Sequence, residues 1–291
     1  MRVKVLFWNY NVAKGSLMTK ESDKADPLAR MVKAQKIDLV VVADCCLPNT
    51  EILNAFTARG LDFTTLAIPH PKVRFFRRST APELVPVVAD ERFDFVRLVA
   101  QGFEEILLGA THLYDRQHTP LPGSRFSKAL GHMPTLFEAE SLVKHHRTIL
   151  IGDFNMTPEE QGMIDPNSFG ALMSWDLAKA QSPPEPHERP RFFNPMWSLM
   201  GRAGAPGTYY WDSTDSHNIY WLCIDGVIAR HSMRGVLRDE TLAILRTIPD
   251  RDGVEVPLVR FAEKHWKINY SDHLPICFEL HLKPRQIGAI S

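Results

Sequence analysis

Short apolar runs recur along this sequence, and they constrain its fold more than any other feature. Each is four to six residues long and rich in β-branched residues, which is typical of buried strands. The runs are Val3–Trp8, Leu39–Val42, Ile106–Ala110, Thr148–Ile151, Ile224–Ile228 and Ile276–Leu280. Helical patterns lie between several of them, at Pro27–Gln35, Glu51–Ala58 and Pro134–His146. Because strands alternate with helices, the sequence predicts an α/β fold.

The length of the chain, 291 residues, suits one large domain or two of average size. A Pro-rich stretch at 182–190 resembles a linker, but the chemically suggestive residues lie on both sides of it. We therefore expect a single domain over 1–291, with long loops near 156–216 and 230–269. Within the second of these stretches, a helix is expected near Arg238–Arg246.

The charge of the chain is balanced, because Lys plus Arg and Asp plus Glu each total 34. An overall basic surface for nucleic acid is therefore excluded, although a local basic face remains possible. A hydrophobic content of 44% excludes a disordered chain.

The sequence also limits where the protein can work. It has no run of about 18 apolar residues, and its first apolar run stops at Asn9, too early for a signal peptide. Its four cysteines are too few for a disulfide framework and lack metal-ligand spacing. We expect no membrane span and a location in the reducing cytoplasm.

The strongest chemical motif is Ile149–Asn155, an apolar strand that ends in Gly-Asp-Phe-Asn. A strand end can hold a carboxylate and an amide at a fixed separation, and residues two apart point to the same side. Asp153 and Asn155 are therefore expected to face one site. A helix cap or a turn before Pro158 is the structural alternative.

A second motif, Tyr270–Pro275, places Asp272 and His273 immediately before the last apolar run. An acid beside a histidine offers a metal ligand, or an imidazole suited to proton transfer near neutral pH. Taken alone, this segment could equally be a structural loop.

Further polar residues stand at the ends of the other apolar runs. Asn9 and Asn11 follow the first, Asp44 the second and His112 the third, while Asp225 begins the fifth. Oxygen ligands with few thiolates favour Mg²⁺ or Mn²⁺ over zinc. These strand ends are therefore candidates for one metal-containing centre.

The order of these motifs resembles the endonuclease/exonuclease/phosphatase superfamily, which has the DNase I-like fold. The resemblance covers nearly the whole chain. It implies a four-layer α/β/β/α sandwich, in which two mostly antiparallel or mixed β-sheets are flanked by helices. The matching motifs are Trp8-Asn9, Ala43-Asp44, Thr111-His112-Leu113, Gly152-Asp153-Phe154-Asn155, Ile224-Asp225-Gly226 and Ser271-Asp272-His273.

The resemblance further implies hydrolysis of a phosphoester with a bound divalent metal ion, Mg²⁺ or Mn²⁺. Asn9, Asp44 and Asp272 would lie at this metal. Three positions depart from the family pattern: Ala43-Asp44 stands where the family has Gln-Glu, Gly226 where it has an aromatic residue, and Cys223 where it often has a basic one. The carboxylate of Asp44 is therefore one methylene shorter.

The same resemblance implies roles for five catalytic residues. Asp153 and Asn155 would position the attacking water and the phosphate, and His112 would contact the phosphoryl oxygens. His273, oriented by Asp225, would serve as the base for proton transfer. Such an arrangement offsets the charge that develops in an in-line displacement.

Substrate contacts are expected in the basic and aromatic segment Lys72–Arg78, which has four positive charges and two phenylalanines able to stack on bases. Arg74, Arg77 and Arg78, together with Asn11, are the candidate residues. An edge strand with solvated arginines is the alternative. A second stacking surface is possible among Trp197, Tyr209, Tyr210 and Trp211, although such aromatics also suit a core.

The leading functional hypothesis is a nuclease that hydrolyses DNA or RNA. One alternative is a phosphatase or phosphodiesterase for a small phosphorylated molecule or a lipid headgroup, which the zero net charge favours. Another is a catalytically weak binding module of the same fold, favoured by Asp44 and by Gly226, which stands where the family has an aromatic residue.

Overall fold

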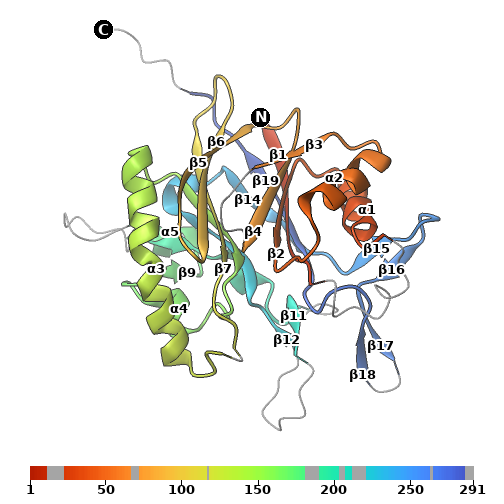
Figure 1. The fold of residues 1–291 in the computed structure, drawn as a ribbon. Helices are drawn as coiled ribbons and strands as arrows, with labels where there is room; N and C mark the ends of the chain where they lie inside the picture. The colour runs from red at the N-terminus through yellow and green to blue at the C-terminus, as the bar shows by residue number, and fades with distance from the viewer. Residues whose placement is uncertain are drawn as a thin grey trace.

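Two large β-sheets face each other at the centre of the molecule, with helices on the outside (Figure 1). This computed structural model describes residues 1–11, 23–66, 72–116, 118–180, 190–202, 207–211, 221–262 and 265–285. Helices α1 (Asp26–Gln35) and α2 (Asn49–Ala58) cover one sheet. Helices α3 (Pro122–Val143) and α4 (Gln161–Ile164) cover the other. The α/β/β/α layering expected from the sequence is confirmed.

The first sheet has six strands and a mixed pattern of directions. Strand β1 runs parallel to β2 and antiparallel to β19, so the first and last core strands are neighbours. In spatial order the strands are β14 (Leu237–Ile244), β19 (Ile276–His281), β1 (Arg2–Asn9), β2 (Leu39–Ala43), β4 (Val73–Arg78) and β3 (Phe63–Thr65).

The second sheet has seven strands and is also mixed, with β7 parallel to β8 and β8 antiparallel to β13. Helix α5 (Trp175–Ala180) contacts the short strands at one edge. In spatial order the strands are β5 (Glu83–Ala89), β6 (Phe93–Val99), β7 (Ile106–His112), β8 (Thr148–Asp153), β13 (Asp225–Arg230), β10 (Phe192–Phe193) and β9 (Ala171–Leu172).

Three two-stranded ribbons complete the described strands. The described part of the chain also contains two 3₁₀ helices, η1 (Pro195–Ser198) and η2 (His231–Met233). None of the described helices is both long enough and apolar enough to cross a membrane. The ribbons are β11 (Tyr209–Tyr210) with β12 (Trp221–Leu222), β15 (Thr247–Pro249) with β16 (Glu255–Pro257), and β17 (Val259–Ala262) with β18 (His265–Ile268).

Alternation along the central strands builds the layers. In β1, Val5 and Phe7 point into the core between the sheets, whereas Leu6 and Trp8 point toward α1 and α2. Strand β8 follows the same rule, since Ile149 and Ile151 face the inter-sheet core and Leu150 faces α3. This period of two decides which side the residue at each strand end will face.

Two glycines allow the second sheet to pack closely. A Cβ atom on Gly152 would lie 2.1 Å from the carbonyl oxygen of Thr111 on β7. One on Gly109 would lie 2.5 Å from the side chains of Phe95 and Leu150. Any larger residue would push β7 and β8 apart, so Gly152 holds the next residue, Asp153, close to β7.

The six expected strands and three helical patterns are all present, with corrected boundaries. The helix expected at Pro134–His146 overlaps the second half of α3, which begins twelve residues earlier at Pro122, continues through Pro134 and ends at Val143. Proline is favoured in the first turn of a helix and disfavoured in its interior. Packing of α3 against the second sheet outweighs the hydrogen bond that an internal proline removes.

The helix expected near Arg238–Arg246 is wrong, because this segment forms strand β14 and pairs with β19. Its local pattern was ambiguous, and the open edge of β19 decides its conformation. The long loops expected near 156–216 and 230–269 contain short helices and strands, β14 to β18 among them.

Candidate active site

Four of the predicted residues lie at strand ends, on the faces that the two sheets turn toward each other. Asn9 follows Phe7 on β1, His112 follows Ala110 on β7, and Asp153 follows Ile151 on β8, each two residues further along the same face. Asp225 begins β13 directly opposite Asp153. The site is therefore one polar end of the inter-sheet core, where apolar packing stops.

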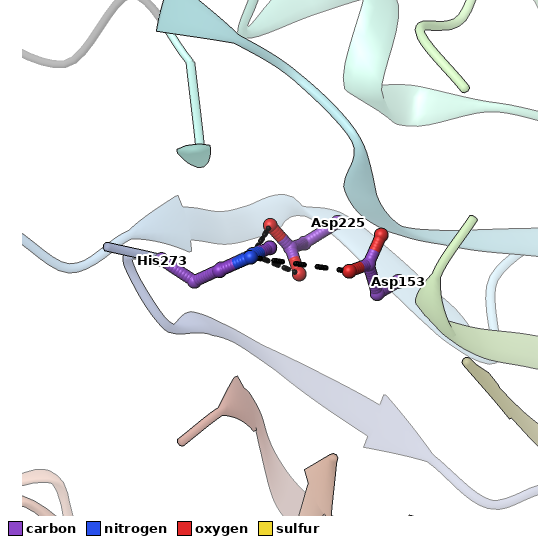
Figure 2. Close-up of side chains that lie close together, drawn as sticks. All are labelled: Asp153, Asp225 and His273. Carbon is purple, nitrogen blue, oxygen red and sulfur yellow. Dashed lines mark hydrogen bonds and ion pairs between the residues drawn. The ribbon is translucent and has the colours of Figure 1, made fainter. Parts of the chain in front are cut away.

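His273 is held by Asp225, as Figure 2 shows. Its Nδ1 lies 2.8 Å and 3.0 Å from the two carboxylate oxygens of Asp225. On the other side of the ring, Nε2 is 4.0 Å from Oδ2 of Asp153. The main chain of Asp225 is itself fixed, because its N–H donates to the hydroxyl of Thr208.

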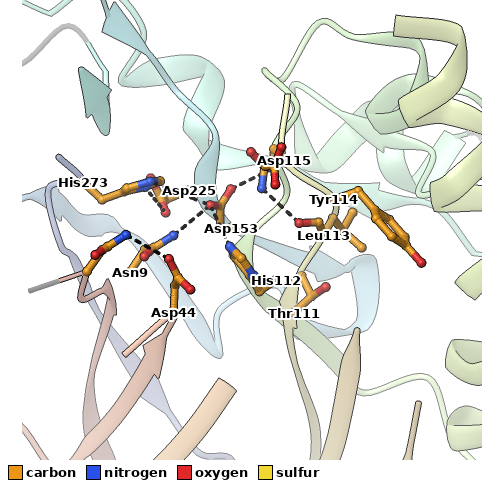
Figure 3. Close-up of polar contacts among 12 residues, drawn as sticks. Asn9, Asp44, Thr111, His112, Leu113, Tyr114, Asp115, Asp153, Asp225 and His273 are labelled. Atoms are coloured by element: carbon orange, nitrogen blue, oxygen red, sulfur yellow. Dashed lines mark hydrogen bonds and ion pairs between the residues drawn. The ribbon is translucent and has the colours of Figure 1, made fainter. Parts of the chain in front are cut away.

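The carboxylate of Asp153 is buried at the centre of this group (Figure 3). Its Oδ2 accepts a hydrogen bond from Nδ2 of Asn9 at 3.0 Å, and its Oδ1 accepts from the backbone N–H of Asn155 at 2.8 Å. Burial, followed by the negative charge of Asp225, raises the pKa of Asp153 to about 7, against the opposing charge of His273. Asp153 is thus a carboxylate that can exchange a proton near neutral pH.

The two histidines of the site have opposite pKa shifts. Burial disfavours the imidazolium of His273, but the carboxylates of Asp225, Asp153 and Asp272 outweigh it and raise the pKa to about 9. Burial, together with the nearby charge of His273, lowers the pKa of His112 to about 3. In the metal-free protein at neutral pH, His273 is therefore a cation and His112 is neutral.

Asn155 shares the site although β8 ends at Asp153. Its backbone adopts a left-handed conformation with φ of 53°, which asparagine tolerates better than most residues. Its Nδ2 donates to the carbonyl of Leu113 at 3.1 Å. Asp153 and Asn155 line the same cleft, and a turn rather than continued strand geometry places Asn155.

Asn9, Asp44 and Asp272 line the same cleft and provide oxygen donors for a cation. Within the described residues, Oδ1 of Asn9 and Oδ1 of Asp272 are buried without any hydrogen-bond partner. Asp44 follows Ala43, the β2 partner of Asn9, and its Oδ2 accepts from Nδ2 of Asn11 at 3.0 Å. Buried carbonyl and carboxylate oxygens without donors are costly, and a hard divalent cation would satisfy them.

A second donor group lies alongside. Ligand atoms of Asp153, Asp225 and His273 all fall within 4.8 Å of one another. However, Nδ1 of His273 is occupied by Asp225, and Asp153 already accepts two hydrogen bonds. This group suits proton transfer better, whereas the unpartnered oxygens of Asn9 and Asp272 suit the metal.

These residues surround an open cleft of about 510 Å³. Tyr209 forms part of the wall, and its ring lies against the His273 ring at a centroid separation of 4.5 Å. Cationic side chains of Lys72, Arg92 and Arg116 line the cleft as well. Arg92 stacks on Tyr114, whose ring points away from Asp153 in Figure 3.

Several hydrogen bonds that build the site carry no signal in the sequence, and neither does Thr208 as a residue. Thr208 accepts hydrogen bonds from the N–H groups of Ile224 and Asp225. The Ser271 hydroxyl donates to the carbonyl of Asn9, and the Trp8 indole donates to the carbonyl of His273. These bonds join segments up to 265 residues apart, so no local pattern reveals them.

The three arginines expected to bind substrate do not line the cleft. Arg74 is buried and donates to the carbonyls of Cys45 and Leu47, while Arg77 and Arg78 donate to carbonyls near their own strand. Strand β4 lies between β2 and β3 rather than at an edge, so Phe75 and Phe76 are buried and cannot stack on bases. Alternation along β4 places Phe75 in the core between the sheets and Phe76 in the core beneath α1 and α2.

The proposed aromatic surface is present in part. Tyr209 and Trp211 line the cleft, and their rings meet edge to face at 5.9 Å. Tyr210 points into the core with 4% exposure, and Trp197 does not line the cleft. Alternation along β11 separates the two tyrosines.

Two mixed sheets between helices, with amides, carboxylates and a histidine–aspartate pair at the strand ends, define a DNase I-like protein. A model of the Endonuclease/Exonuclease/phosphatase family matches residues 9–273, and the chain belongs to this family. No curated protein matches the sequence significantly.

Solved structures share the fold at low sequence identity. TDP2 from D. rerio, complexed with single strand DNA product, is 13% identical with a TM-score of 0.55, over 96% of this chain and 99% of that one. A family protein from Bacteroides thetaiotaomicron is 14% identical with a TM-score of 0.52, over 98% and 99%. The human Nocturnin catalytic domain with bound sulfate is 14% identical with a TM-score of 0.51, over 97% and 94%.

Proposed function

We propose that this protein is a divalent-metal-dependent phosphodiesterase that hydrolyses DNA or RNA. The observation that carries the proposal is the pair of buried, unpartnered oxygens on Asn9 and Asp272, in the same cleft as the Asp225–His273 pair. Oxygen donors beside a proton-transfer group are the requirements of metal-assisted phosphoester hydrolysis. Membership of the Endonuclease/Exonuclease/phosphatase family supports it.

In this proposal Asn9, Asp44 and Asp272 hold Mg²⁺ or Mn²⁺. When bound, the metal ion supplies positive charge that offsets the negative charge developing on the phosphate. Asn9 also contacts the proton-transfer group, because its Nδ2 donates a hydrogen bond to Asp153 while its Oδ1, without a hydrogen-bond partner, can bind the metal. One amide thus links the metal ligands to the proton-transfer group.

Asp153 is the group we assign to accept the proton of the attacking water. Its pKa, raised to about 7, makes it a stronger base than an ordinary carboxylate. The family resemblance implies that His273 is this base, but the carboxylates around it raise its pKa and so favour the imidazolium, which is a hydrogen-bond donor. We therefore assign the His273 imidazolium to the phosphoryl oxygen, with Asp225 fixing the ring.

His112 and Asn155 complete the arrangement. His112 is neutral, its Nδ1 has no partner among the residues described, and its Nε2 lies 3.6 Å from Oδ2 of Asp153. A neutral imidazole can donate one hydrogen bond to a phosphoryl oxygen without carrying a charge. Asn155 holds its backbone N–H on Asp153 and so keeps the base oriented.

A nucleic acid is favoured as substrate by the walls of the cleft. Lys72 and Arg92 offer contacts to phosphates that flank the scissile one, and Tyr209 and Trp211 offer stacking surfaces. The fold accommodates such a ligand in D. rerio TDP2, which was crystallised with single strand DNA product. A small phosphorylated molecule or a lipid headgroup is the second candidate, and the balanced net charge favours it.

The proposal is tested by assaying the purified protein with Mg²⁺ or Mn²⁺ against single- and double-stranded DNA, RNA and bis-p-nitrophenyl phosphate. We expect hydrolysis that EDTA abolishes and that Asp272→Asn reduces by about 10²-fold or more. An absence of metal-dependent hydrolysis on every substrate contradicts the proposal and favours the binding module.

The choice of substrate is tested with Lys72→Ala, which removes an exposed cation at the cleft. On an oligonucleotide this variant should raise KM several-fold and weaken its salt dependence, with bis-p-nitrophenyl phosphate hydrolysis spared. Lys144→Ala at the end of α3 removes a matched charge outside the cleft and should change neither. Equal behaviour of the two variants on oligonucleotides would favour the small-molecule alternative.

A further inference from the structure

Arg74 is an internal cation that contacts the turn following strand β2. It lies on β4 opposite Val42, and only 9% of its surface is exposed. Its guanidinium donates to the carbonyls of Cys45 and Leu47, each at 2.5 Å, and to Oδ1 of Asn49 at 2.9 Å. One side chain thus spans the turn from Cys45 to the first residue of α2.

This placement of a positive charge is not explained by charge pairing. Among the described residues, no carboxylate oxygen lies within 4.0 Å of the Arg74 guanidinium, although buried charges usually pair. Asn49, which it contacts, begins helix α2, where the helix dipole favours negative rather than positive charge. The three acceptors on the turn are therefore what holds this cation in place.

The turn that Arg74 contacts begins at Asp44. The Asp44 N–H meets the carbonyl of Lys72 at 3.4 Å, so the residue that precedes β4 contacts the start of the turn, and Arg74 on β4 contacts the rest of it. Asp44 adopts a left-handed backbone with φ of 45°, an uncommon conformation for an aspartate that its neighbours must maintain. Its carboxylate then points to Asn11 and into the cleft.

We propose that Arg74 is a positioning residue for Asp44, setting the turn that presents this carboxylate to a divalent cation. The inference rests on the proposed metal site. A short aspartate has less freedom to find its ligand position than a glutamate, so its main chain has to be fixed in advance. Three diverging hydrogen bonds from one planar guanidinium provide that, and a lysine ammonium cannot reproduce their geometry.

The test measures Mn²⁺ affinity directly, through the electron paramagnetic resonance signal of free Mn²⁺, with no substrate present. We expect Arg74→Lys to weaken Mn²⁺ binding at least about tenfold, as partners behind metal ligands commonly do. Asn49→Ala removes only one acceptor and should weaken it less, in the same direction. Asn49→Ala keeps Arg74 and its hydrogen bonds to the carbonyls of Cys45 and Leu47. This variant therefore tests the inference even if the Arg74→Lys protein does not fold.

Two controls separate positioning from general loss of stability. Arg230→Lys replaces another buried arginine, which pairs with Glu140 at the far end of β13 from Asp225. It should lower the melting temperature without changing the Mn²⁺ Kd by more than about twofold. In an Asp44→Asn background, Arg74→Lys should likewise change Kd by less than about twofold, since its target carboxylate is gone.

The outcomes distinguish this inference from the function on which it rests. A wild type that binds no Mn²⁺ overturns the proposed metal site. A wild type that binds Mn²⁺ and is weakened by Asp44→Asn, with Arg74→Lys and Asn49→Ala unchanged, overturns the role of Arg74 alone. The role of Arg74 is also overturned if Arg74→Lys reduces Mn²⁺ affinity equally in the wild-type and Asp44→Asn backgrounds.

Discussion

His112 and His273 are the same residue type, yet their neighbours shift their pKa values in opposite directions, so that one is neutral and the other cationic. Asp225 approaches Nδ1 of His273 from a position 48 residues earlier in the sequence, while Nδ1 of His112 has no hydrogen-bond partner among the described residues. The sequence predicted that both histidines stand at strand ends. It could not predict which one is protonated, because a pKa depends on burial and on contacts between distant segments.

The first prediction concerns the carboxylate that holds His273. Asp225→Asn keeps the shape of the side chain but removes the charge that raises the pKa of His273 and fixes its ring. We expect kcat on bis-p-nitrophenyl phosphate to fall by about 10²-fold or more, as when a histidine loses its orienting carboxylate elsewhere. Circular dichroism should show an unchanged fold.

A matched control is available outside the cleft. Asp90 accepts from Nδ1 of His132 at 2.9 Å but does not line the cleft. Asp90→Asn should therefore leave kcat close to that of the wild type. If Asp225→Asn keeps more than half of the wild-type kcat, the role assigned to the pair is incorrect.

At the scale of elements, prediction succeeded where the hydrophobic pattern was strong and local. Buried strands such as β1 and β8 have apolar residues on both faces, so their short apolar runs were sufficient evidence. Strand β14 is partly exposed and rich in charge, so its conformation depends on pairing with β19. The order of the strands in each sheet could not be predicted either, because it depends on pairing between distant segments such as β1 and β19.

The second prediction tests the close packing of β7 against β8. Gly152→Ala places a methyl group 2.1 Å from the Thr111 carbonyl, which only a movement of backbone can relieve. We expect the free energy of unfolding in urea to fall by about 2 kcal/mol or more. Gly152→Ala should also lower kcat, because a shift of the backbone at residue 152 moves Asp153.

Gly131 provides the comparison, since a Cβ atom there meets nothing within 4 Å on helix α3. Gly131→Ala should increase the free energy of unfolding by about 0.5 to 1 kcal/mol, because alanine favours a helix. Similar effects of the two substitutions would show that contact with Thr111 is not what requires Gly152.

Across the whole molecule, the outer helical layer is joined to the second sheet by a buried ion pair. Glu140 of α3 accepts from Nε of Arg230 on β13 at 2.8 Å and from the hydroxyl of Thr148 on β8 at 2.8 Å. Burial opposes the charged form of Glu140, but Arg230, His146 and Thr148 outweigh it and lower the pKa to about 2. The layers therefore depend on an ionised carboxylate.

The third prediction follows from this lowered pKa. The pKa of Glu140 in the folded state lies below the ordinary glutamate value. The contribution of Glu140 to the free energy of unfolding is therefore complete above about pH 4.5 and is lost as pH falls toward 2. Between pH 6 and pH 3 the wild type should lose about 2 kcal/mol of unfolding free energy from this group. Urea denaturation at both pH values measures it.

Two variants isolate this contribution. Glu140→Gln should be less stable at pH 6 and should show a shallower decline toward pH 3, because the titrating group is gone. Glu138→Gln alters an exposed carboxylate on the same helix and should reproduce the wild-type decline. An identical decline in wild type and Glu140→Gln would show that this carboxylate does not drive acid unfolding.

The pairing of β1 with β19 determines when the site can first exist during protein synthesis. Strand β1 is synthesised well before its partner from Ile276 to His281, which follows Asp272 and His273 in the sequence. At ordinary elongation rates this delay is on the order of tens of seconds. During this delay, the carbonyl of Asn9 lacks the hydrogen bond that the Ser271 hydroxyl donates in the folded protein. The candidate site therefore cannot be complete in a growing chain until the segment from Asp272 to β19 has been synthesised.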